Sequence, residues 1–213
     1  MKSRCIENLR RLQVGCGPKH IRSAWWNVDI REFAGIDQVM DVTMPWPWAD
    51  LLDYVYGEHF LEHLDLNGAI RFLVEAGTSL RRGGRLRLST PSLEWVMATH
   101  FDPLSTDAAK QLRQTIGINR AFYGWGHRFL YSHAFLNHTL TSLGYEDVKF
   151  HSYGESHDLE LVGLEMHGGY SVALGFPSVW IVEATRGGKP IAEDLALSEM
   201  VDREFLAQVR SGH

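Results

Sequence analysis

The sequence predicts an α/β fold built around a parallel sheet, and two observations support this. Short apolar segments with strand character alternate with segments whose apolar residues recur at helical spacing. In addition, the segment 12–29 begins as a strand, passes through the glycine turn Gly15-Cys16-Gly17 and ends a second strand on Asp29. That is half of a nucleotide-binding βαβ unit, in which glycine lets the backbone approach a ligand and the acid accepts ribose hydroxyls.

The spacing of the glycine turn separates two classes of cofactor. A dinucleotide fold needs G-x-G-x-x-G, with an acid about 20 residues further on. Here His20 occupies the third small position, and Asp29 lies only twelve residues past Gly17. A cofactor without phosphates, whose ribose lies close to the turn, therefore fits better than a dinucleotide.

Composition bounds the size and the partners of the molecule. A chain of 213 residues with 45% apolar content fits a single domain, 1–213. The net charge of −5 argues against a nucleic-acid partner, because neutralising phosphates needs clustered cations. Two cysteines, Cys5 and Cys16, give no disulfide framework, and no apolar run approaches the roughly 20 residues of a membrane span. We therefore expect a cytoplasmic protein without a membrane span.

The remaining elements follow in chain order. After strands at 12–14 and 27–30, we predict strands at 38–42, 53–58, 85–89, 145–153 and 178–185. We predict helices at 67–80, at 106–116 and after the cap Ser132, with a terminal helix at 191–210. Gly83-Gly84 is expected to end the first of these helices, and Pro91 to begin a further one.

The loop Pro45-Trp46-Pro47-Trp48 cannot be regular structure, because its prolines remove backbone donors and push the residues before them into extended conformations. Its two indoles have two interpretations. They either plug the edge of the sheet or form an apolar wall for an adenine ring.

The ordered motifs LQVGCG, WNVDI, MDVTMPWPW, YGEHFLEHL and LRRGGRLRLSTPS resemble those of class I S-adenosylmethionine-dependent methyltransferases. Within that superfamily the chain is similar to small bacterial predicted methyltransferases, type 11-like, with W-x-N-V-D-I and L-E-H-L signatures. The resemblance implies a Rossmann-like, seven-stranded, mostly parallel sheet with helices on both faces and an antiparallel last strand. It also implies an enzyme that binds S-adenosyl-L-methionine and methylates a small-molecule or saccharide-type acceptor.

The resemblance further implies a cofactor site at the carboxyl ends of the strands. The glycine turn would contact the methionine part through backbone atoms, the acid of the second strand would hold the ribose diol, and the third strand would meet the adenine edge. The site comprises Gly15, Cys16, Gly17, Asp29, Ile30, Asp41, Val42, Glu58 and His59. Many relatives carry an acid where this chain has Gln13, so either Glu58 binds the cofactor ammonium or affinity is lower.

Two other functions compete with this interpretation. The string His59-Phe60-Leu61-Glu62-His63 is a literal H-x-x-E-H, which on a helix would place two imidazoles on one face for a zinc hydrolase. Against this, His59 follows a strand immediately, and we expect no metal. The third alternative is a catalytically inactive cofactor-binding domain.

The segment 92–131 interrupts the strand-helix rhythm and is expected to form the acceptor side of the site. It is rich in aromatic residues, and Gly124 and Gly126 would let it move as a lid. His127 is the side chain closest to a neutral-pH base in type, with His63 and Tyr131 as further catalytic candidates. The alternative is a structural histidine held by the aromatic cluster. Methyl transfer needs a base only when the acceptor is a hydroxyl or a similar weak acid.

Overall fold

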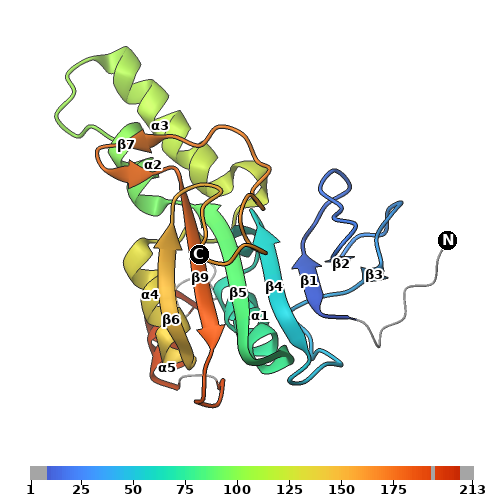
Figure 1. Ribbon diagram of the computed structural model, residues 1–213. Helices are drawn as coiled ribbons and strands as arrows, with labels where there is room; N and C mark the ends of the chain where they lie inside the picture. The colour runs from blue at the N-terminus through green and yellow to red at the C-terminus, as the bar shows by residue number, and fades with distance from the viewer. Residues whose placement is uncertain (1–8, 193–194, 207–213) are drawn as a thin grey trace.

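A computed structural model describes residues 9–192 and 195–206 and is built on one seven-stranded sheet (Figure 1). The strands are β1 (Arg11–Val14), β2 (Trp26–Asp29), β3 (Gln38–Val39), β4 (Leu52–Glu58), β5 (Leu80–Pro91), β6 (Tyr145–His151) and β9 (Val179–Arg186). Their order is β3-β2-β1-β4-β5-β9-β6, and β9 is antiparallel to both β5 and β6. The predicted Rossmann-like, mostly parallel sheet with an antiparallel last strand is confirmed.

One face of the sheet is apolar and is covered by helices. Helices α1 (Leu66–Ser79), α4 (His133–Ser142) and α5 (Leu195–Val201), the last continued by a π-helical turn at Asp202–Leu206, lie behind the sheet in Figure 1. The predicted cap Ser132 accepts a hydrogen bond from the Phe135 N–H at 3.1 Å. Side chains of all three helices join Val14, Val55 and Leu88 in one core. Of the predicted terminal helix at 191–210, residues 193–194 and 207–210 lie outside the described residues.

The opposite face is polar and is covered by loops. Within the described part of the chain, the connections β1–β2, β2–β3 and β3–β4 contain no helix, because they are short or carry Pro45 and Pro47. The segment 152–171 lies over this face, and its residues Leu161 and Leu164 pack with Tyr56 of β4. Helices were predicted on both faces, whereas the structure has them on one face and at the strand ends.

The segment between β5 and β6 carries helices beyond the strand ends. Helix α2 (Leu93–His100) packs against α3 (Ala108–Tyr123), which is followed by a short 3-10 turn, η3 (Gly124–Gly126). In Figure 1 these helices project above the sheet, beside a small hairpin of β7 (Val172–Ala173) and β8 (Phe176–Pro177) that sequence periodicity did not predict. Helix α3 continues beyond the predicted 106–116, since no glycine or proline breaks it from Ile118 to Tyr123.

Three predicted boundaries are corrected. Gly83-Gly84 does not end a helix, because α1 stops at Ser79 and the glycines lie inside β5. Pro91 does not begin a helix but ends β5, and Ser92 caps α2 by accepting from the Trp95 N–H at 3.1 Å. The third strand is only Gln38–Val39, since β3 pairs on one side alone and the chain then turns toward the proline loop.

The two indoles of the proline loop belong to the core. Trp46 and Trp48 are 8% and 7% exposed, and the Trp46 ring packs 6.0 Å from that of Phe72. The Trp46 Nε1–H donates to the Val42 carbonyl at 3.0 Å, which satisfies its only polar atom. The plug interpretation of this loop therefore agrees with the structure. No helix among the described residues combines the length and apolar character needed to cross a membrane.

Candidate active site

A cavity of about 600 Å³ opens at the carboxyl ends of β1 to β4. Parallel strands end at the same edge, so residues far apart in sequence meet there. Six of the nine predicted cofactor residues line this cavity, which we call the cofactor cavity: Gly15, Asp29, Ile30, Asp41, Val42 and His59. Cys16, Gly17 and Glu58 are not among its lining residues.

Asp29, the predicted ribose ligand, is a buried acid that lines the cofactor cavity. Its carboxylate accepts the backbone N–H of Gly17 and of Arg31, each at 3.0 Å, and the Arg31 Nε–H at 3.1 Å. Burial works against ionisation, but these hydrogen bonds and the Arg31 charge outweigh it and lower the pKa of Asp29. The cavity therefore presents an ionised carboxylate whose orientation is fixed from both sides.

The glycine turn is required by backbone conformation and by close packing. Gly15 and Gly17 have φ of +58° and +56°, and a Cβ on Gly15 would lie 2.3 Å from Phe60 Cδ2. The Cys16 N–H donates to Val28 O at 3.4 Å and the Gly17 N–H to Asp29, so both donors are already used within the protein. Burial, with the Asp29 charge, raises the pKa of the Cys16 thiol to about 11. Of this turn, only Gly15 is exposed to the cofactor cavity.

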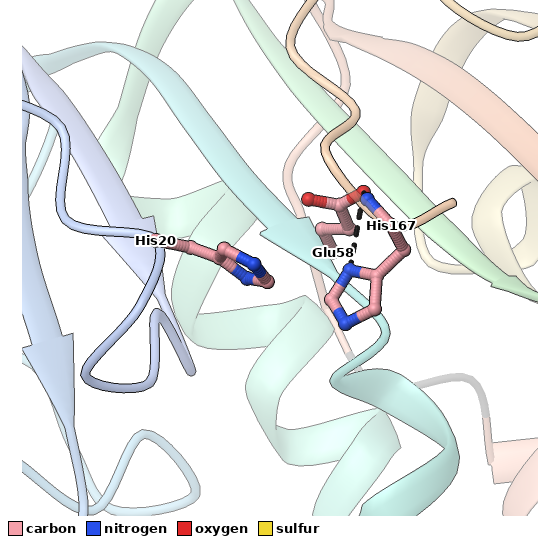
Figure 2. Close-up of side chains that lie close together, drawn as sticks. All are labelled: His20, Glu58 and His167. Atoms are coloured by element: carbon pink, nitrogen blue, oxygen red, sulfur yellow. Dashed lines mark hydrogen bonds and ion pairs between the residues drawn. The ribbon is translucent and has the colours of Figure 1, made fainter.

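Glu58 points toward the segment over the polar face of the sheet. Its Oε1 accepts the N–H groups of Met166 and His167 at 2.7 and 2.9 Å, while its Oε2 is buried without a partner. Figure 2 shows Glu58 with His20 and His167 around it. Gln13 is also buried and donates its amide to His20 O at 3.0 Å. Glu58, the predicted partner of the cofactor ammonium, therefore does not line the cofactor cavity, and neither does Gln13.

His59 stands at the boundary of the site in a strained conformation. Its φ is +45°, a region that non-glycine residues rarely occupy, and strain of this kind concentrates at functional sites. Its ring Nδ1 lies 3.1 Å from the fully buried carboxylate of Glu62, which also accepts the Thr90 hydroxyl at 3.1 Å. Burial opposes protonation of His59, but the hydrogen bond and charge of Glu62 and the charge of Glu58 raise its pKa overall.

A second cavity of about 520 Å³ adjoins the first. The two share His59, His63 and Trp125, and we call the second the acceptor cavity. Helices α2 and α3 and the turn after them supply much of its wall, so residues of the segment 92–131 line this cavity. Its other lining residues include Pro91, Trp95, Val96, His100, Arg120, His127 and His167.

Two of the three catalytic candidates line the acceptor cavity. The Nδ1 of His127 lies 2.9 Å from Ala121 O, so it carries the proton and leaves the Nε2 lone pair available. His63 lies beside it, with ring centroids 5.2 Å apart. Tyr131 lies in neither cavity: it is 2% exposed, packs on Phe129 at 4.8 Å, and burial raises the pKa of its hydroxyl.

The H-x-x-E-H string does not form the zinc site that the hydrolase alternative requires. His59 precedes the short 3-10 helix η2 (Leu61–His63), so the two histidines do not share an α-helix. Among the described residues, two groups have ligand atoms within 4.8 Å of one another, and neither includes His59. They are Glu62 with His63 and His127, and His20 with Glu58 and His167.

The structure adds lining residues beyond the predicted set of site residues. Trp125 lines both cavities, and its φ is +59°. It lies between Gly124 and Gly126, so the two flanking glycines could have indicated an unusual backbone at this position. Arg128 lines the cofactor cavity and pairs with Asp65 at 3.5 Å. No sequence pattern indicated that His20 and His167 lie close together, because their contact depends on how the segment 152–171 packs.

Comparison with known proteins supports the fold through structure alone. A scan against protein-family models gives no match, and no curated protein matches the sequence significantly. An S-adenosylmethionine-dependent methyltransferase from Archaeoglobus fulgidus is 18% identical, with 84% of this chain and 87% of that chain covered and a TM-score of 0.52. A counterpart from Mesorhizobium loti is also 18% identical, with coverages of 83% and 90% and a TM-score of 0.51.

A third solved structure, from Thermotoga maritima, is described as an S-adenosylmethionine-dependent methyltransferase and possible histamine N-methyltransferase. It is 15% identical, with coverages of 83% and 81% and a TM-score of 0.52. Identities this low carry information about backbone architecture only. Together with the strand order and the antiparallel β9, they show that this chain has the fold of the class I S-adenosylmethionine-dependent methyltransferases.

Proposed function

We propose that this protein is an S-adenosyl-L-methionine-dependent methyltransferase that acts on a small-molecule or saccharide-type acceptor. The observation that carries the proposal is the pair of adjoining cavities with the shared wall His59, His63 and Trp125. One cavity holds the acids Asp29 and Asp41 at the ends of neighbouring strands. The other is walled by indole and imidazole rings and is large enough for a small acceptor.

In this proposal the cofactor lies in the cavity of about 600 Å³. Asp29 accepts the ribose hydroxyls, Asp41 and Val42 meet the adenine, and Gly15 faces the methionine part. The lowered pKa of Asp29 suits this role, because a carboxylate accepts hydrogen bonds from two hydroxyl groups better than a carboxylic acid does. The shared wall of His59, His63 and Trp125 would then hold the methyl group between the two cavities.

Methyl transfer requires little acid–base chemistry from the protein. When bound, S-adenosyl-L-methionine would supply a methyl group that its sulfonium has already activated. Alignment and exclusion of water therefore supply most of the rate. For a hydroxyl acceptor, the free Nε2 of His127 can take the proton, since its Nδ1 is held by Ala121 O.

The cofactor assignment is tested by calorimetry with S-adenosylmethionine and its demethylated product. We expect micromolar binding, about −8 kcal/mol. Asp29→Ala should weaken it at least about tenfold while the fold persists, because a bidentate charged contact contributes about 1.5 to 3 kcal/mol. The matched control is Asp102→Ala, a partly exposed acid paired with Lys110 outside both cavities. Equal affinity in wild type and Asp29→Ala would refute the ribose contact, and preference for a nicotinamide dinucleotide would refute the class.

The acceptor side is tested with His127→Ala after a methyl-acceptor screen has found a substrate. If His127 is the base, turnover falls roughly 100-fold or more while cofactor affinity and melting temperature stay unchanged. His138→Ala, on the exposed side of α4, is the control. A His127→Ala protein with normal turnover, or one that has lost stability, makes His127 a packing residue and leaves His63 as the candidate base.

A further inference from the structure

Three side chains from distant parts of the chain converge where the segment 152–171 crosses the end of β4. His20 comes from the β1–β2 loop, Glu58 ends β4, and His167 comes from the segment after β6. Figure 2 shows the carboxylate and the two imidazoles close together, and their ligand atoms lie within 4.8 Å of one another. We propose that His20, Glu58 and His167 bind one divalent transition-metal ion, for which Zn²⁺ is the probe.

Glu58 supplies the first physical reason. The residue is 6% exposed, and its Oε1 is oriented by the N–H groups of Met166 and His167. Its Oε2 is buried and has no hydrogen-bond partner. Burying a carboxylate oxygen without a partner is costly, and native structures rarely leave such groups unsatisfied. A bound cation would supply the missing partner.

His167 supplies the second reason. Its Nδ1 lies 3.3 Å from Glu58 Oε1, as the dashed line in Figure 2 marks, yet the atom is buried and makes no well-formed hydrogen bond. Two neighbouring side chains thus each have one buried atom without a hydrogen-bond partner, Glu58 Oε2 and His167 Nδ1. The ring of His20 lies 4.7 Å from that of His167, edge to face, which brings a third donor to the same place.

The chemistry of the donor set indicates the class of metal. Two imidazole nitrogens and one carboxylate oxygen suit Zn²⁺ and other divalent transition metals, whereas Mg²⁺ and Ca²⁺ prefer oxygen ligands alone. Such an ion would join the β1–β2 loop to the segment 152–171 beside the site. The group Glu62, His63 and His127 is less suited, since both oxygens of Glu62 already bind His59 and Thr90.

The test is titration of the full chain, freed of metal by a chelator, with ZnCl₂ in a calorimeter and with Co²⁺ followed by visible absorption. We expect one ion per chain. His167→Ala and His20→Ala should each weaken zinc binding by at least on the order of 100-fold. Loss of a residue that only supports a metal ligand already lowers metal affinity by about 10- to 100-fold, and loss of the ligand itself should lower it no less. Glu58→Gln is the conservative variant: its amide oxygen can still accept the two backbone N–H groups, so the fold should persist while zinc affinity falls. Zinc should raise the melting temperature of the wild type and not that of His167→Ala.

Two controls separate this site from others. His138→Ala, an exposed histidine outside both metal-compatible groups, should bind zinc as the wild type does. His127→Ala should do so as well. Absence of saturable zinc binding in the wild type would overturn the proposal, as would binding that His127→Ala abolishes and His167→Ala retains.

The outcome is independent of the proposed function. Zinc binding that His167→Ala abolishes, in a protein with no affinity for S-adenosylmethionine, keeps the metal site and removes the methyltransferase assignment. If the wild type takes up no zinc, and if His20→Ala and His167→Ala weaken cofactor binding in metal-free protein, the three residues contact the amino-acid end of the cofactor. That result overturns the metal proposal and leaves the proposed function in place.

Discussion

The two faces of the central sheet are held by different forces. On the face under α1, α4 and α5, strand residues such as Val14, Val55 and Leu88 are apolar and fully buried. On the other face, alternate residues of the same strands are polar, and Arg87 is 0% exposed at its centre. Period-two alternation along each strand therefore divides an apolar core from a buried polar network.

Arg87 shows what the polar face does. Its guanidinium donates two hydrogen bonds of 2.8 Å to Glu165, binds Glu183 of β9, and donates to Glu155 O at 3.0 Å. Tyr56 donates its hydroxyl to Leu164 O at 2.9 Å. Apolar packing tolerates many arrangements of similar volume, whereas these bonds require particular partners. The polar face can thus hold the irregular segment 152–171 in one position without a helix.

The largest expected effect is that of Arg87→Met, which removes the ion pairs of Arg87 on the polar face. The substitution leaves the carboxylate of Glu165 buried without its cation and leaves Glu183 with Arg85 at 3.6 Å, which costs about 3 to 5 kcal/mol of unfolding free energy. Denaturant unfolding measures the loss, and hydrogen exchange should show faster exchange confined mainly to 152–171. Adding Glu165→Gln and Glu183→Gln should recover part of the loss, because the uncompensated charges are then gone. A triple variant no more stable than Arg87→Met alone would contradict the ionic explanation.

Leu88→Ala tests the apolar face with a somewhat smaller effect. Leu88 is 1% exposed and pairs with Val182 across β9. Truncation should cost about 2 to 5 kcal/mol through lost burial and the cavity left behind. Denaturant unfolding should show the loss, while exchange in 152–171 should follow global stability. Selective loosening of that segment in Leu88→Ala would remove the distinction between the two faces.

The smallest expected effect is a pH dependence of the polar face through His151. Burial lowers the pKa of His151, Glu183 at 3.3 Å opposes this, and the charges of Arg87, His157 and Lys149 add to it. A histidine with a lowered folded pKa binds fewer protons than in the unfolded chain. The contribution of His151 to the unfolding free energy is therefore fully present above its ordinary pKa of 6.5. It is lost as the pH falls through the lowered pKa of the folded state.

Urea unfolding across about pH 5 to 8 measures this contribution. His151→Asn should flatten the decline of unfolding free energy below the ordinary histidine pKa. His138→Asn, which alters an exposed histidine, should leave the slope unchanged. A slope that His151→Asn does not alter would assign the dependence to other groups.

Local patterns indicated the positions of the strands and, with the family resemblance, six residues that line the cofactor cavity. The glycine turn and Asp29 could be predicted because the features that define them, a left-handed backbone position and an acid ending a strand, are written within eighteen residues. Asp41 followed because parallel strands must end at one edge, and His59 was implied by the family resemblance. The Ser132 cap was predictable for the same reason, since a cap and its helix are adjacent in sequence.

The surroundings of the remaining predicted site residues depend on the tertiary structure. Glu58 was expected at the cofactor, but alternation along β4 directs it toward the polar face, where His20 and His167 meet it. Tyr131 reads as a reactive residue in an aromatic stretch, yet it pairs with Ser92 in an isolated bridge and its ring joins the core. Contacts between residues about a hundred positions apart, such as that of Glu58 with Met166, depend on long-range packing. The periodicity of the sequence does not indicate them.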